Sequence, residues 1–143
     1  MKCADILEPE VLPVAQENII QLPLGLFGFE QIKRYVLLAR PEEEPFLWLQ
    51  MMEEPSLAFL VIPSSEIGSE YQPDISAEDV EFLGLTEPGD ALVYNIVTLR
   101  QNGAATANLK GPLVVNRYTL AGKQVVPVNA SEYALQHRLS LGE

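Results

Sequence analysis

The apolar runs of this chain are short, and each is bounded by proline, glycine, asparagine, serine or clustered acids. Eleven prolines and nine glycines interrupt the 143 residues at close intervals. No stretch keeps the apolar period of an amphipathic helix for more than about ten residues. Runs of about five to nine residues that are rich in β-branched and aromatic side chains are typical of strands. The expected strands are Ile6–Val14, Asn18–Leu24, Tyr35–Ala39, Phe46–Met52, Leu57–Ile62, Ala91–Leu99, Ala105–Leu109, Leu113–Thr119 and Lys123–Val128.

This pattern predicts an all-β, mainly antiparallel fold, in which the whole chain forms a single compact β-barrel-like domain with one or two short helices. The length is sufficient for one core of this kind. Ser76 is expected to cap a helix over Ala77–Leu83 that ends at Gly84. A second helix is expected over Glu132–His137, because Ser131 precedes it as a possible cap.

The last two expected strands are predicted to form a hairpin. Ala121 and Gly122 are expected at its turn, where Gly122 is available for a positive φ. Pro112 cannot donate a ladder hydrogen bond, so it marks the start of a strand or a sheet edge. Asn108 and Asn116 can satisfy backbone groups at the corners of the bend around it. This part of the chain is therefore expected to form a corner of the barrel.

Acidic residues are concentrated in one part of the chain. Between Pro41 and Asp90 there are thirteen acidic side chains and no lysine or arginine. Residues 1–90 carry a balance of −14 and residues 91–143 a balance of +3, within a total of −11. Such a concentration favours solubility, a basic partner or the exclusion of other polyanions. It disfavours direct binding to nucleic acid or to an anionic membrane, because both need clustered lysine and arginine.

Residues suited to catalysis, metal binding or cofactor binding are scarce. The chain has one histidine, His137, and one cysteine, Cys3, which cannot supply a metal site or a nucleophilic triad. The run Glu42–Glu44 lacks the spacing of a calcium loop. The segment Gly25–Gly28 lacks the G-x-G-x-x-G pattern and is expected to be a tight turn whose apolar residues fold back on the core. These motifs therefore indicate no metal site, no cofactor site and no nucleophilic catalytic site.

Two other classes of function stay open on the residues alone. A β-barrel module for a small ligand or carbohydrate needs a concave pocket with aromatic lining, whereas this chain has one tryptophan and scattered phenylalanines. A carboxylate-dependent hydrolase needs two acids that converge in a cleft with raised pKa values. A convex acidic face without a pocket would instead favour a protein that acts by binding another protein.

A cytoplasmic location is expected. No apolar run approaches the roughly 18 to 20 residues of a membrane-spanning helix. No apolar signal region precedes Cys3, and a single cysteine agrees with a reducing compartment.

Four blocks of sequence, spread over most of the chain from Asn18 to Leu139, form a series. The blocks are Leu22–Glu30 (LPLGLFGFE), Pro45–Gln50 (PFLWLQ) with Glu54–Phe59 (EPSLAF), Thr106–Asn116 (TANLKGPLVVN), and Gly122–Val126 (GKQVV) with Ser131–Tyr133 (SEY). In their order and separation they resemble the family of the flagellar assembly factor FliW. Phe27 stands where that family usually has proline, and Gly111 replaces its usual alanine.

The resemblance implies a compact, mainly antiparallel, β-barrel-like fold and a regulator without enzyme activity. Proteins of this family bind newly made flagellin in the cytoplasm. They also bind CsrA, a small basic RNA-binding dimer that represses flagellin messages, and they relieve this repression once flagellin has been secreted. CsrA is bound away from its RNA-contacting surface, so the antagonism is allosteric. The implied partners are CsrA and flagellin, with no direct contact to nucleic acid or membrane.

The residues that bind a partner are expected mainly in the acid-rich stretch. Apolar side chains there stand among acids, as in a binding hot spot, although packing beneath a long loop would give the same pattern. The role of Asn108 is open between a corner hydrogen bond and a partner contact. The candidate partner-binding residues are Glu66, Ile67, Glu70, Tyr71, Asp74, Ile75, Glu78, Asp79 and Asn108. The residues of the family blocks expected to be structural are Gly25, Gly28, Phe29, Pro112, Asn116 and Gly122.

Overall fold

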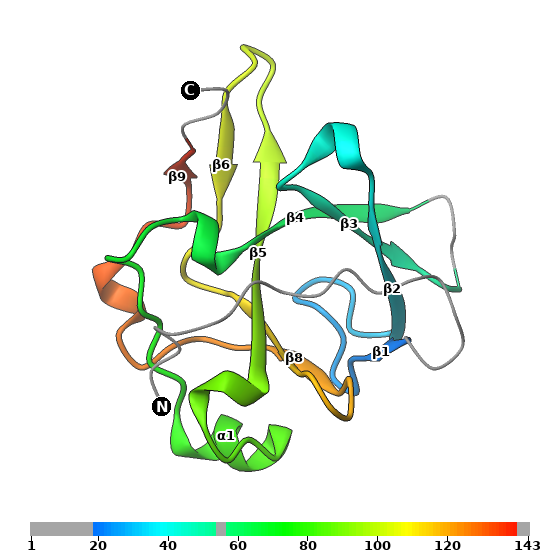
Figure 1. The fold of residues 1–143 in the computed structure, drawn as a ribbon, viewed down its shortest axis with the longest axis vertical. Helices are drawn as coiled ribbons and strands as arrows, with labels where there is room; N and C mark the ends of the chain where they lie inside the picture. Colours follow the sequence, from blue (N-terminus) through cyan, green and yellow to red (C-terminus); the bar gives the residue numbers. More distant parts are fainter. Residues whose placement is uncertain (1–18, 54–56, 140–143) are drawn as a thin grey trace.

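The computed structural model describes residues 19–53 and 57–139, which form a nine-stranded sheet and one α-helix (Figure 1). The expected strand Ile6–Val14 and the residue Cys3 lie outside the described residues. The helix α1 spans Ala77–Leu83, and short 3₁₀ turns are formed by η2 (Pro41–Glu43), η3 (Ser64–Glu66), η4 (Pro88–Asp90) and η5 (Ala130–Glu132). The strands are β1 (Ile20–Gln21), β2 (Arg34–Ala39), β3 (Leu47–Met51), β4 (Ala58–Pro63), β5 (Ala91–Leu99), β6 (Ala105–Ala107), β7 (Leu113–Asn116), β8 (Gly122–Gln124) and β9 (His137–Arg138).

The long strand β5 organises the sheet, and Figure 1 shows it crossing the whole molecule. The strands follow the order β1-β2-β3-β4-β5-β6-β9, while β7 pairs with β5 and β8 pairs with β7. On one side of β5 lies β4. The other side is shared, since Ala91–Tyr94 pairs with β7 and Val97–Leu99 pairs with β6. Every one of these ladders is antiparallel.

The sheet curls until its edge strands β1 and β8 nearly meet. The backbone NH of Gln21 in β1 donates to the carbonyl of Leu120, just before β8, at 2.9 Å. A single bridge between Gln21 and Ala121 continues this contact, but no full ladder closes the sheet there. The predicted fold class, mainly antiparallel and barrel-like, is therefore confirmed, although the barrel is not closed.

Three apolar clusters fill the fold. The largest lies inside the curled sheet and includes Tyr35, Leu49 and Tyr94. The second lies beneath α1. The third joins Ile62 of β4 and Val97, on the opposite half of β5, to the segments that run before α1 and after η5. Burial of such apolar surface is the main favourable contribution to folding, so both outlying segments are fixed to the sheet by their side chains.

Each expected strand within the described residues contains a strand, but some are shorter than expected. β1 keeps only two residues of the run from Asn18 to Leu24, and β8 ends at Gln124, whereas the apolar run continues to Val128. A strand extends only as far as a neighbour pairs with it, and β2 begins at Arg34, opposite Gln21. Apolar pattern marks the strands here better than it marks their ends.

The helix expected over Glu132–His137 is wrong. Residues Ala130–Glu132 form the 3₁₀ turn η5, Tyr133 is extended with φ −123° and ψ 161°, and His137 begins β9. A helix of six residues has little stability of its own, so tertiary contacts decide the conformation. Here the carbonyl of Ala134 accepts a hydrogen bond from the NH of Leu109, and β9 pairs with β6.

The expected place of Gly122 at the turn of the β7–β8 hairpin is wrong. The residue with positive φ in the β7–β8 connection is Leu120, at 62°, while Gly122 lies in β8 itself. A Cβ on Gly122 would lie 2.8 Å from the side chain of Leu22 and 3.0 Å from that of Val115. Glycine is needed at this position because β8 crosses very close to the core.

The turn at Gly25–Gly28 differs in part from expectation. Gly25 has φ 69° and Gly28 has φ 89°, as in the expected tight turn. A Cβ on Gly25 would lie 2.5 Å from the backbone of Glu30, so only glycine fits. Leu26 is buried, but Phe27 is 56% exposed and Phe29 is 41% exposed. Only one of the apolar residues of this turn therefore folds back on the core.

Candidate partner-binding site

A pocket of about 690 Å³ opens where three segments from distant parts of the sequence meet. The first is the loop between η3 and α1, the second is the break between β6 and β7, and the third runs from η5 to β9. Figure 1 places these segments on one side of β5, away from the curled part of the sheet. The lining residues are Ile67, Gly68, Ser69, Glu70, Tyr71, Leu109, Glu132, Tyr133, Ala134 and His137.

The floor of the pocket is held by buried hydrogen bonds. The hydroxyl of Tyr71 donates to the carbonyl of Leu109 at 2.9 Å. The side-chain amide of Asn95, on β5, donates to the Tyr71 hydroxyl at 3.0 Å and to the carbonyl of Asn108 at 2.9 Å. Asn95 is fully buried and Tyr71 is 6% exposed. Buried polar groups that are paired in this way hold one side-chain arrangement, because any other would leave them unpaired.

Leu109 reaches the pocket because the chain leaves the sheet between β6 and β7. The side-chain oxygen of Asn108 accepts hydrogen bonds from the NH of Lys110 at 2.9 Å and of Gly111 at 3.1 Å. The NH of Asn108 still donates to the carbonyl of Ile96 on β5. Asn108 therefore satisfies backbone groups at the bend, the corner role that was left open beside partner contact.

The loop before α1 is tied to the segment around η5. The rings of Tyr71 and Tyr133 meet edge to face, with centroids 4.8 Å apart. The Tyr133 hydroxyl accepts from the NH of Gln72 at 3.1 Å. The Asn129 side chain accepts from the NH of Asp74 at 2.9 Å and donates to the carbonyl of Gln72 at 3.1 Å. These contacts span more than fifty residues of sequence and build the pocket wall.

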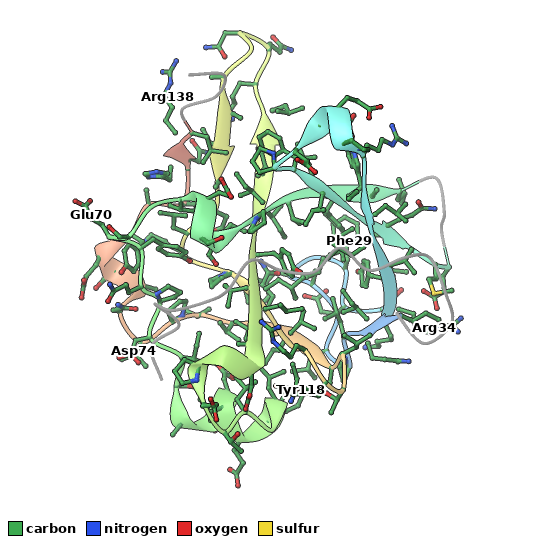
Figure 2. All side chains as sticks on the ribbon, viewed as in Figure 1. Phe29, Arg34, Glu70, Asp74, Tyr118 and Arg138 are labelled. Atoms are coloured by element: carbon green, nitrogen blue, oxygen red, sulfur yellow. The ribbon has the colours of Figure 1, made fainter. Side chains whose placement is uncertain are left out.

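The charged groups at the pocket are mainly carboxylates. Glu70 and Glu132 are both exposed, and the lining contains no lysine or arginine. Lys110 lies next to the lining residue Leu109, but its Nζ donates to the carbonyl of Ala130 at 2.9 Å. Figure 2 shows Glu70 at one edge of the molecule and Arg138 extending away from it at the end of β9. The pocket therefore combines carboxylates with a lining of mixed polar, aromatic and aliphatic side chains.

The structure separates the candidate partner-binding residues into exposed and buried groups. Glu66, Glu70 and Glu78 are exposed, Ile67, Asp74 and Asn108 are partly buried, and Tyr71, Ile75 and Asp79 are buried. Of these nine residues only Ile67, Glu70 and Tyr71 line the pocket. The loop therefore brings one acid, one aliphatic and one aromatic side chain together, while Ile75 belongs to the core beneath α1.

The helix α1 has the ends that the sequence predicts. The hydroxyl of Ser76 accepts from the NH of Asp79 at 3.1 Å, and Gly84 ends the helix with φ 69°. Asp79 is 6% exposed, and its carboxylate pairs with Lys123 of β8. The Lys123 ammonium also lies 5.3 Å from the centre of the Phe82 ring. Asp79 thus joins α1 to the sheet.

The second asparagine of the bend connects the same helix to β7. The Asn116 side-chain amide donates to the carbonyl of Leu83 at 2.8 Å, and its oxygen accepts from the NH of Tyr118 at 2.8 Å and of Thr119 at 3.2 Å. β7 begins directly after Pro112, as expected from the missing proline donor.

Several other acids of the acid-rich stretch have local partners. The Glu43 carboxylate accepts from the indole NH of Trp48 at 2.9 Å. The Arg34 side chain donates to Glu53 at 2.8 Å, and this hydrogen bond lowers the pKa of the Glu53 carboxyl. The hydroxyl of Thr86 donates to Asp90 at 2.6 Å, and this bond is the main cause of the lowered pKa of Asp90.

Within residues 19–53 and 57–139 no three histidine, cysteine or acidic residues gather as a metal ion would require. None of the helices found there is long and apolar enough to cross a bilayer. Sequence reasoning did not select Leu109, Glu132, Tyr133 or His137 as site residues. The available signal was their position in or beside the blocks Thr106–Asn116 and Ser131–Tyr133.

A family model and individual relatives of this chain carry the same family name. The model of the FliW protein family matches residues 8–139. The flagellar assembly factor FliW of Leptospira interrogans (strain Fiocruz L1-130) is 39% identical over 122 residues, which cover 84% of this chain and 81% of that protein. The flagellar assembly factor FliW of Geobacter sulfurreducens is 35% identical over 127 residues, 88% of this chain and 79% of that protein.

A solved structure leads to the same family. The crystal structure of a flagellar assembly factor FliW superimposes with a TM-score of 0.78 at 32% identity, over 90% of both chains. The family model, the curated relatives and the solved structure therefore agree over most of the length. This chain belongs to the FliW family of flagellar assembly factors.

Proposed function

We propose that the protein is a cytoplasmic factor that binds flagellin and also binds CsrA, whose repression of flagellin messages it relieves allosterically. Family membership over residues 8–139 supports a role in flagellar assembly through protein partners. The observation that carries the choice of a basic partner is the set of exposed acids, including Glu66, Glu70 and Glu78, in a stretch without lysine or arginine. Such a surface attracts a basic protein and repels nucleic acid.

We place the CsrA surface on the loop between η3 and α1 and on the exposed face of α1. Ile67, Glu70 and Tyr71 would contact the partner at the pocket, and Glu66, Asp74 and Glu78 would contribute charge around it. The buried residues Ile75 and Asp79 would support this surface from beneath. Asn108 would act indirectly, because its side chain holds the bend that carries Leu109.

Negative charge brought to CsrA would raise the free energy of binding RNA phosphates nearby. Screening limits this effect to about 8–10 Å at physiological salt. The triple variant Glu66→Gln, Glu70→Gln, Asp74→Asn is therefore expected to weaken both CsrA binding and RNA release. If CsrA affinity and RNA release stay at wild-type values, electrostatic antagonism through these three residues is wrong.

The main test is a binding titration of the whole chain with CsrA and flagellin from the same organism, repeated from low to high salt. We expect CsrA binding to weaken strongly as salt rises and flagellin binding to depend on it less. RNA release from CsrA is followed in parallel with a labelled flagellin leader. Failure to retain either protein at low salt would overturn the proposed function.

The pocket is the feature that a small-ligand module would also require, since it has two tyrosines in its lining. Family membership favours the protein-binding role, because the relatives are assembly factors. The two functions differ in one result: a small-ligand module would keep its ligand when the partner proteins are added, and it would not change RNA binding by CsrA.

A further inference from the structure

The pocket lining combines apolar side chains with exposed carboxylates. The lining includes the apolar side chains of Ile67 and Leu109 and the rings of Tyr71 and Tyr133, beside polar groups. Its charged groups include the exposed carboxylates of Glu70 and Glu132, contributed by two segments sixty residues apart in the chain. A side chain with an apolar stem and a positive end matches both kinds of lining group.

The tyrosine hydroxyls do not serve as free recognition groups. The Tyr71 hydroxyl already binds the Leu109 carbonyl and the Asn95 amide, and the Tyr133 hydroxyl already accepts from the NH of Gln72. What the partly exposed Tyr133 offers an occupant is ring surface, which attracts a cation through its negative face. Neither carboxylate has an ion-pair partner within the described part of the chain, and salt bridges there are limited to other acids.

Lysine and arginine side chains have the required chemistry. Each carries a charged head on an aliphatic stem, and the stem packs along apolar surface while the head stays near carboxylates and water. Arginine adds a flat guanidinium that stacks on aromatic rings and bonds to carboxylates with two NH groups. A neutral aliphatic side chain would leave the carboxylates unpaired, and an acidic one would be repelled by them.

The pocket is formed before any partner arrives. Asn95, Tyr71 and Asn108 lock the floor through buried hydrogen bonds, and Asn129 ties the loop wall to the segment around η5. A preformed site loses less conformational freedom on binding, so one inserted side chain contributes more to affinity than a contact on a flexible loop.

We propose that this pocket receives a lysine or arginine side chain of a basic partner protein and acts as the anchor point of the acidic surface. The proposal rests on the proposed function for the identity of the partner, which is CsrA there. The pocket itself is tested independently of CsrA. Glu132 and Tyr133, which lie outside the acid-rich stretch, take part in binding the cation.

The first experiment titrates the full chain with N-acetyl-arginine methylamide and follows backbone amide signals by NMR. We expect shifts at Gly68, Glu70 and Ala134 with a dissociation constant in the millimolar range. N-acetyl-lysine methylamide is expected to act more weakly, and N-acetyl-norleucine methylamide, which has a neutral side chain, should cause no comparable shifts. Equal shifts with the norleucine compound, or none with arginine, would overturn the proposal.

The matched variants have the same change in charge. The pocket variant is Glu70→Gln with Glu132→Gln, and the control is Glu42→Gln with Glu44→Gln, at exposed acids around η2. All four positions are exposed, so melting temperatures are expected to stay near the wild-type value. The arginine compound should bind the control like the wild-type protein and should lose most of its effect on the pocket variant.

The second experiment measures CsrA affinity with the same variants. We expect about a five- to tenfold loss for the pocket variant and less than about twofold for the control. If the pocket and control variants lose CsrA affinity equally, while the arginine compound binds the wild-type protein as expected, the pocket takes free cations only. The proposed anchor for CsrA is then wrong. If the wild-type protein binds no CsrA, the proposed function fails, and the NMR titration alone decides whether the pocket takes a cationic side chain.

Discussion

Two neighbouring regions of this protein use acidic side chains in different ways. The helix region consists of Ser76–Gly84 together with Lys123, and the pocket region consists of the loop Ile67–Tyr71 with the segment Glu132–His137. In the helix region Asp79 is buried and paired with Lys123. In the pocket region Glu70 is exposed at the rim of a cavity. The two acids are only nine residues apart in the same acid-rich stretch. Their position in the sequence therefore does not distinguish a carboxylate that stabilises the fold from one that is exposed to a partner.

The difference lies in what surrounds each acid in three dimensions. Asp79 is close to the start of α1, where the helix dipole favours negative charge, and β8 supplies its lysine from a distant part of the chain. Glu70 precedes the buried Tyr71, whose hydrogen bonds fix the loop and hold the neighbouring carboxylate outward. The first acid stabilises the fold, and we expect the second to contribute chiefly to binding.

The largest expected effect is a difference in the free energy of unfolding between variants of the two asparagines that support these regions. Asn116→Ala should lower the free energy of unfolding by about 3 kcal/mol, because it unpairs backbone groups of both α1 and the β7–β8 turn. Asn108→Ala should cost about 1 kcal/mol, since its bend is partly exposed. Urea unfolding measures both. Asn102→Ala, in the exposed β5–β6 turn, is the control, and a larger loss for Asn108 than for Asn116 would contradict the comparison.

The next largest expected effect is on the stability of variants at Asp79 and Glu70. Asp79→Ala should cost about 2 kcal/mol, because it leaves Lys123 without its partner in a partly buried position. Glu70→Ala should stay within about 0.5 kcal/mol of the wild-type protein, as for other exposed substitutions. Thermal or urea unfolding of the two variants compares them directly. Equal losses would show that Glu70 has a structural role that its exposure does not suggest.

Tyr71→Phe tests the floor of the pocket. Loss of the hydroxyl removes one hydrogen bond to Leu109 and one from Asn95, and should lower the free energy of unfolding by about 1.5 kcal/mol. The ring remains, so packing against Tyr133 should persist. Amide hydrogen exchange is expected to rise in the pocket region and not in α1. Faster exchange throughout α1 would show that the two regions do not open separately.

The smallest expected effect is the response to acid near the helix region. Hydrogen bonds from Thr86 and Glu87 lower the pKa of Asp90. A lowered pKa gives stability that is present above the ordinary value of 3.8 and is lost as pH falls through the lower value of the folded state. Asp90→Asn should therefore flatten the fall in melting temperature as the pH drops below the ordinary value of 3.8. An unchanged slope would exclude Asp90 as a source of acid sensitivity.

Much of the sheet could be predicted because short apolar runs between breakers leave few alternatives to strands. The helix α1 was also predictable, since Ser76, two early acids and Gly84 are local signals at its ends. The segment after Ser131 carries a similar cap but lacks a glycine end, and it was expected to be helical. There the pairing of β9 with β6 and the contact between Tyr133 and Tyr71 prevailed over a weak local preference.

The candidate site was predictable only in part. Ile67, Glu70 and Tyr71 were selected from the sequence because acids and apolar residues alternate there, and they do line one pocket. The opposite wall was missed, because nothing local in Glu132 or Tyr133 marks a binding role. This wall is held in place by hydrogen bonds between residues more than fifty positions apart in the sequence.

The sequence by itself determined the class of fold, the position of α1, the bends at two asparagines and the family. Each of these depends on local patterns or on motifs that can be compared position by position. The tertiary structure alone decided which acids are buried, why Gly122 must be glycine, and that Leu109, Tyr71 and Tyr133 enclose a pocket. These properties depend on which distant segments of the chain come into contact when the sheet curls. The order of residues along the chain does not give the distances between those segments.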